Sequence, residues 1–123
     1  MHEGDVMIVI EKAFNALRSA DVPVYFPGTH KGECTSPYAV IRKLSSSQYV
    51  TFSTDVHYME IICCAPNISG CFELADKAKA GLRTIYPTVR STRDVSEPYW
   101  SETSRCWMVQ LEYTYYKKIK EGV

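Results

Sequence analysis

The run 56–64 is the feature that most limits how this chain can fold. Successive side chains of a β-strand point to opposite faces, and here both alternating sets are largely apolar. The two sets are Val56, Tyr58, Ile62 and Cys64 on one face and Met59, Ile61 and Cys63 on the other. A strand that is apolar on both faces is usually central in its sheet and covered on both sides. We therefore expect a sheet with this strand near its centre.

Two segments have the apolar periodicity of helices. In residues 5–20 the apolar side chains recur every three or four positions, and Asp5 is placed to cap the N-terminus. Residues 70–86 show a second stripe, for which we predict Ser69 as the N-cap. Gly81 interrupts that stripe at a cost of about 1 kcal/mol relative to alanine, which predicts close packing there.

The rest of the chain predicts strands joined by loops. The expected strands are 22–26, 38–44, 88–95 and 105–118, and the longer loops are 27–37, 45–55 and 96–102. A chain of 123 residues with 46% apolar and 23% charged residues is typical of one globular domain, here residues 1–123. We therefore predict a two-layer α+β domain of order α-β-β-β-α-β-β, with a mostly antiparallel sheet and both helices on one face.

The charge balance argues against two classes of partner and leaves nucleic-acid binding as a third-ranked alternative. Fourteen Lys and Arg residues offset fourteen Asp and Glu residues, so the chain lacks the positive field that attracts nucleic acid or an anionic membrane. Lys117, Lys118 and Lys120 provide at most a local basic patch. No apolar run is long enough to span a bilayer, and the acidic N-terminus differs from a signal peptide. We expect no membrane and no sequence-specific nucleic acid among the partners.

Reactive chemistry has no clear motif in this sequence. The five cysteines are odd in number and irregularly spaced, which in a reducing cytosol is typical of buried thiols. His30 and Cys34 lack the second ligand pair that a structural zinc needs. His57 lies too far along its strand from Cys63 to activate it. With no phosphate-binding glycine loop or hydrolase motif present, we expect no catalytic residue, no metal ligand and no cofactor.

Aromatic residues are the informative excess. Nine tyrosines, two tryptophans and four phenylalanines occur, and several fall in predicted loops. Tyrosine and tryptophan are enriched at protein interfaces because they bury a large area and keep a polar tip. The final strand is also much longer than the usual five or six residues, so we expect part of it to bend or to pair with another chain. The predicted interface residues are Tyr49, Phe52, Tyr99, Trp100 and Tyr116.

Three segments carry a family resemblance: Tyr58–Asn67 (YMEIICCAPN), Phe72–Leu82 (FELADKAKAGL) and Val109–Tyr115 (VQLEYTY). In their order and spacing the chain resembles the small phage tail-terminator proteins, also called tail-completion, tail-to-head joining, minor capsid or minor tail proteins. The resemblance implies a non-enzymatic virion component, present in the host cytoplasm during assembly. It also implies a hexameric ring on the head-proximal end of the tail tube, where it stops tube polymerisation and meets the head connector. The implied partners are the chain itself, the tail-tube protein and the connector protein.

Other functions stay open at this point. A head-closure or other minor tail protein would share the same architecture. A small cytosolic ligand-binding or enzymatic domain would instead need a concave pocket with converging polar groups, such as one lined by His57, Tyr58 and Cys64. For a ring-forming protein the central event is a head-to-tail contact whose rotation from copy to copy closes a ring. We expect loops 45–55 and 96–104 to contact the neighbouring copy or the tail tube.

Overall fold

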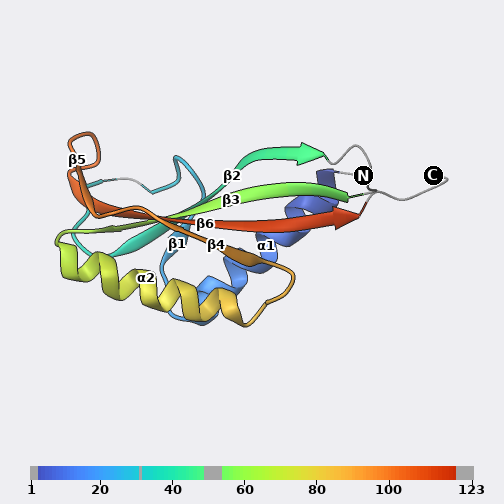
Figure 1. Cartoon of the computed structure of the whole chain (residues 1–123). Helices are drawn as coiled ribbons and strands as arrows, with labels where there is room; N and C mark the ends of the chain where they lie inside the picture. Colours follow the sequence, from blue (N-terminus) through green and yellow to red (C-terminus); the bar gives the residue numbers. More distant parts are fainter. Residues whose placement is uncertain (1–2, 31, 49–53, 119–123) are drawn as a thin grey trace.

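The computed structural model describes residues 3–30, 32–48 and 54–118. Its elements are α1 (Glu3–Ser19), β1 (Val24–Tyr25), β2 (Tyr38–Gln48), β3 (Thr54–Ala65), α2 (Ile68–Arg83), β4 (Arg90–Val95), β5 (Tyr99–Ser101) and β6 (Cys106–Lys118). The six strands form one sheet of order β1-β2-β3-β6-β4, with β5 pairing with β6. The pair β1–β2 is parallel and the others are antiparallel. Both helices lie against one face of this sheet (Figure 1), so the predicted α+β architecture is confirmed.

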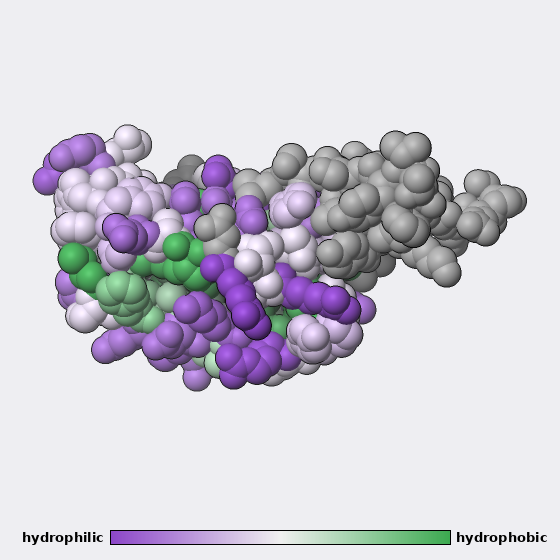
Figure 2. Space-filling model, viewed as in Figure 1, coloured by the Kyte–Doolittle hydropathy of each residue, from purple (hydrophilic) through white to green (hydrophobic). Residues whose placement is uncertain are grey.

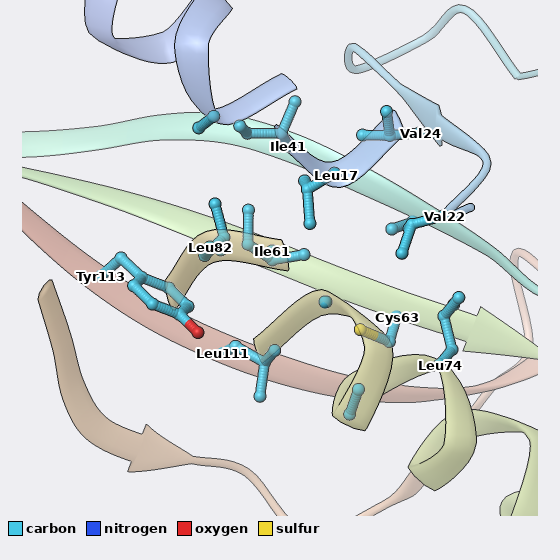
Figure 3. Close-up of a cluster of buried hydrophobic side chains, with 14 of the residues drawn as sticks. Leu17, Val22, Val24, Ile41, Ile61, Cys63, Leu74, Leu82, Leu111 and Tyr113 are labelled. Carbon is cyan, nitrogen blue, oxygen red and sulfur yellow. The ribbon is translucent and has the colours of Figure 1, made fainter. Parts of the chain in front are cut away.

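The core lies between the sheet and the two helices. Met59, Ile61 and Cys63 of β3 alternate onto the helix-facing side and are fully buried there. From α2, the stripe expected from the sequence packs down onto them, with Leu74 and Leu82 buried. Side chains from α1, α2, β2, β3 and β6 point into this one layer (Figure 3). The apolar area that these side chains remove from water is the main source of stability.

At Gly81, α2 lies in close contact with the C-terminal end of α1. A Cβ atom at this position would lie 2.9 Å from the Cβ of Ala20 and 3.0 Å from the carbonyl oxygen of Ala16. The small residues of α1 and the glycine of α2 therefore let the helix axes come close. The expectation that Gly81 signals close packing is confirmed.

The ends of α2 differ from the prediction. Asn67, not Ser69, is the N-cap, and its side-chain oxygen accepts a hydrogen bond from the Gly70 amide at 2.7 Å. Ser69 lies inside the first turn and donates its hydroxyl to the same Asn67 oxygen. At the other end the predicted boundary of 86 is wrong, because the amides of Ile85 and Tyr86 donate to carbonyls three residues back and tighten the chain into turns.

The hairpin of β2 and β3 is more extended than the sequence predicts. β2 continues to Gln48 and β3 begins at Thr54, so much of the expected loop 45–55 is strand. The register shifts between Lys43 and Ser46, which is the signature of a bulge or irregularity. Backbone pairing needs no apolar side chain, and this explains why the polar serines there gave no strand signal.

The final strand also differs from expectation. β6 pairs with β3 over its length, from Trp107 opposite Ala65 to Lys118 opposite Thr54, so it has no overhang on this side. The whole of this long strand can pair because β3, with 12 residues, is almost as long as β6, with 13. The predicted loop 96–102 contains a further short strand, β5, which pairs with the start of β6.

The second face of β3 is covered only in part. Cys64 is buried together with Tyr38, Cys34 and Cys106, whereas Ile62 is half-buried. In the described ranges no helix lies on this face (Figure 1). β3 is thus central, as predicted, but the expected cover on both sides is wrong for much of its length.

Candidate protein interface

The β5 hairpin presents the two aromatic residues that the sequence singled out. Tyr99 pairs with Met108 and Trp100 with Trp107, so the two side chains lie on opposite faces of the sheet. Trp100 contacts the Trp107 ring edge to face, with ring centroids 5.8 Å apart. Tyr99 keeps 37% and Trp100 41% of its surface exposed. A large part of each ring is therefore available to a partner.

Tyr99 stands on the face of the sheet that no described helix covers. Burial raises its pKa, and the nearby carboxylate of Glu60 raises the pKa further while Arg42 opposes the shift. Arg42 and Glu60 form an ion pair at 2.7 Å on the same face. The tyrosine ring thus lies near a polar pair at the rim of an otherwise partly apolar sheet face.

The other predicted interface residues do not join this group. Tyr49 and Phe52 lie outside the described residues. The backbone of Tyr116 pairs with Val56 near the far end of β6. Met108, the partner of Tyr99, precedes Tyr116 by eight residues, about 26 Å of strand at ~3.3 Å per residue. The structure therefore separates Tyr116 from the β5 hairpin.

A flank of α2 adds exposed apolar side chains that sequence reasoning missed. Ile68 and Phe72 lie one turn apart and are 40% and 49% exposed. Apolar residues gather toward the end of α2 where the helix begins (Figure 2). Phe72 was the part of this signal present in the sequence, because it falls beside the buried stripe of Cys71, Leu74 and Ala75, whereas Ile68 has the spacing of that stripe and is exposed at the first position of α2. An exposed apolar pair favours a contact with another molecule.

Next to the other end of α2 lies a hollow of about 590 Å³ that the sequence did not predict. We call it the cationic hollow. Among the described residues that line it, four are positively charged and none is negatively charged. The lining residues are Lys79, Leu82, Arg83, Tyr86, Val89, Arg90, Ser91, Arg93, Val95 and Tyr113. The α2–β4 turn brings the two halves of this lining together, and no periodic pattern in the sequence spans that turn.

The cations of the hollow are open to solvent and to a partner. Lys79, Arg83, Arg90 and Arg93 are all exposed. Among the described residues Arg42 and Glu60 form an ion pair, and none of these four side chains forms one with a described carboxylate. Unpaired cations that share one concave surface favour an anionic ligand.

Two tyrosines that line the hollow lie close to its cations. The guanidinium of Arg90 lies over the Tyr86 ring, 5.7 Å from its centroid, and its Nε donates to the carbonyl of Pro87 at 3.4 Å. Burial raises the pKa of Tyr113 to about 12, and the nearby Arg83 acts in the opposite direction. Tyr113 therefore remains neutral at physiological pH and adds no negative charge to the hollow.

The cysteines are buried thiols, as the sequence predicts. Three of them, distant in sequence, gather with Tyr38 in a second small core: Cys34, Cys64 and Cys106. Burial raises the pKa of Cys34 to about 11, and electrostatic interactions with the Cys106 and Cys71 thiols add to the shift. Protonated thiols are poor nucleophiles. His30 stacks on Tyr38 with ring centroids 3.7 Å apart, and no group of His, Cys, Asp or Glu among the described residues is arranged to hold a metal ion.

Among the described residues, His57, Tyr58 and Cys64 do not line one common pocket. His57 is buried on the helix-facing side, where it stacks on Tyr115 at 5.1 Å between ring centroids. Tyr58 and Cys64 fall on the opposite face of β3, because their positions differ from His57 by an odd number of residues. Cys64 instead lines a hollow of about 280 Å³ with His30 and Tyr38.

Comparisons with known proteins leave the family open. No family model matches the chain, and no curated protein sequence matches it. None of the helices in the described ranges is both long and apolar enough to cross a membrane. The function is therefore argued from the surfaces described above.

Proposed function

We propose that this protein is a structural component that works by binding copies of itself and neighbouring proteins in an assembly. The observation that carries the proposal is the half-exposed pair Tyr99 and Trp100 on β5. Large aromatic side chains held on a short hairpin supply contact area at low entropic cost, as interfaces require. Ile68 and Phe72 extend the apolar surface along α2.

The sheet edge and the charge balance support the same function. β4 pairs with β6 on one side, and over the described residues its other side has no strand partner. Open strand edges are surfaces onto which another chain can add. The net charge of zero gives little repulsion between copies.

The specific role we propose is that of a phage tail terminator, as the sequence resemblance implies. In this role a ring of copies, expected to be a hexamer, closes the head-proximal end of the tail tube and then meets the head connector. The partners are the chain itself, the tail-tube protein and the connector protein. The protein would act in the host cytoplasm during assembly and remain in the virion, with no cofactor. A different neck or minor tail role is the alternative within the same class.

Two experiments test this proposal, one on the purified chain and one on its effect on tail tubes. Native mass spectrometry and negative-stain electron microscopy of the purified chain should show a ring-shaped oligomer, and the double variant Tyr99→Ala/Trp100→Ala should lose it while remaining folded. Tyr58→Ala, which removes a half-buried tyrosine elsewhere on the sheet, is the matched control. Added to a polymerising tail-tube protein, the wild-type chain should cap the tubes and limit their length. Rings that bind tubes without limiting growth would instead favour another neck role.

A further inference from the structure

The two ends of α2 carry surfaces of opposite charge. The β5 hairpin, at the end where α2 begins, carries exposed Glu97 and Glu102 on either side of the aromatic pair Tyr99 and Trp100. We call these four residues the acidic tip. The cationic hollow is lined by the last turns of α2 and by β4, and the end of α2 lies away from β5 (Figure 1). The same hairpin also carries exposed Arg105, so its net charge is −1, whereas the lining of the hollow contains four cations.

The acidic tip does not fill the hollow of its own chain. The Cys71 thiol of α2 donates to the carbonyl of Trp107, which fixes the start of α2 beside β5. Arg83 of the hollow is twelve residues further along α2, about 18 Å away at 1.5 Å per residue. Over the described residues, neither Glu97 nor Glu102 forms an ion pair with a cation of the hollow. β4 links the two surfaces, since Val95 of the hollow is two residues before Glu97, and the hollow is open to a group from another molecule.

The geometry points to a head-to-tail contact in which the acidic tip of one copy enters the cationic hollow of the next. This inference rests on the proposed function, and it names the two surfaces through which one copy of the chain would bind the next. The guanidinium forks of Arg83 and Arg93 match the geometry of a carboxylate. A hollow of about 590 Å³ lies within the range that accepts a ligand-sized group.

The apolar part of the hollow favours a protein segment over a simple anion. Val95 and Tyr86 are 41% and 64% exposed there and would stay in water if the hollow held only a phosphate group. The aromatic ring of Trp100 from a second copy would cover them. Non-specific nucleic-acid binding depends on a wide positive field, whereas the charges of this chain sum to zero.

Because the tip and the hollow are different surfaces, the contact is heterologous. Such a contact repeats from copy to copy and gives a ring when its rotation closes. It therefore fits the ring-forming role without any further interface. Every copy would use both surfaces, and a change to either one would break the assembly.

Charge reversal with mixing tests this contact. One variant reverses the hollow (Arg83→Glu/Arg93→Glu) and a second reverses the tip (Glu97→Arg/Glu102→Arg). Each should self-associate at least tenfold more weakly than wild type, because carboxylates of the tip then meet carboxylates at positions 83 and 93, or arginines of the reversed tip meet the cations of the hollow. In an equimolar mixture the reversed tip can meet the substituted carboxylates at positions 83 and 93, and the unchanged tip can meet the unchanged hollow, so the mixture should assemble with the two variants alternating. Sedimentation velocity and native mass spectrometry measure both results.

Lys12→Glu/Lys77→Glu is the matched control, since it changes the net charge as the reversed hollow does but at exposed helix positions outside the hollow. Circular dichroism verifies that every variant is folded. Reversed variants that assemble like wild type would overturn this contact and leave the proposed function standing. Loss of assembly that mixing does not restore would also overturn the pairing of tip with hollow. A wild-type chain that stays monomeric would overturn both.

Discussion

The indole rings of Trp100 and Trp107 meet edge to face across the β5–β6 pair, with their centroids 5.8 Å apart. Trp107 packs against the core, while Trp100 stays 41% exposed. The two tryptophans are thus adjacent but have different surroundings. Stability is expected to depend mainly on the inner ring and association on the outer one.

Single alanine substitutions separate these two roles. Trp107→Ala should lower the free energy of unfolding by about 3 kcal/mol, because it removes ring area packed on the core. Trp100→Ala should cost no more than about 1 kcal/mol, the value of an aromatic pair, and yet weaken self-association. Urea denaturation and sedimentation velocity measure the two effects. Equal losses of stability in both variants would contradict the assignment of stability to Trp107 and association to Trp100.

Gly81 offers a test of the helix packing. Gly81→Ala should gain helix propensity worth about 1 kcal/mol but force the new Cβ against Ala20 and the Ala16 carbonyl, at 2.9 and 3.0 Å. Overpacking of this kind costs about 1–3 kcal/mol, so we expect a net loss of stability or none gained. Ala80→Gly, at the exposed neighbouring position, reports the propensity term alone. A clear rise in thermal midpoint for Gly81→Ala would show that the helices are further apart.

The N-terminus of α2 provides a third prediction. Asn67→Ala should lower stability by about 1 kcal/mol, because it removes the acceptor of the Gly70 amide. Ser69→Ala should cost less, since the Ser69 hydroxyl donates to Asn67 and caps no backbone amide directly. Thermal denaturation of the two variants under the same conditions checks this ranking. The reverse order would restore Ser69 as the cap.

The buried thiols should make the free energy of unfolding decrease at alkaline pH. Burial raises the pKa of Cys34 to about 11 in the folded chain, from an ordinary value of 9. The unfolded chain therefore loses this proton first, so the contribution is fully present below pH 9 and is lost as the pH rises toward 11. Urea denaturation at several pH values should show stability falling across this window. Cys34→Ser should make the fall less steep, and an unchanged slope would show that the Cys34 thiol does not contribute.

The periodic parts of the fold could be predicted from the sequence. The doubly apolar run of β3 predicted its central position, and the stripe of α2 predicted its buried face. The extension of β2 through serines could not be predicted, because backbone pairing there leaves no side-chain pattern. β5 could not be predicted either, because it is only three residues long and is defined by its pairing with β6.

The candidate surfaces were predictable to different degrees. Tyr99 and Trp100 stood out because large aromatics in a predicted loop are uncommon, and the structure confirms that both are partly exposed. The cationic hollow was missed, because Arg83 and Arg93 lie on different elements and meet only through the turn between α2 and β4. A charge that is dispersed in the sequence gives no local signal, even when the fold gathers it.

Self-association of the full chain is the central claim, and sedimentation velocity over a range of concentrations tests it most directly. We expect a discrete oligomer far heavier than the 14.0 kDa chain, which dissociates in the Tyr99→Ala/Trp100→Ala variant and persists in Tyr58→Ala. A single species with the mass of one chain at every concentration would contradict the claim.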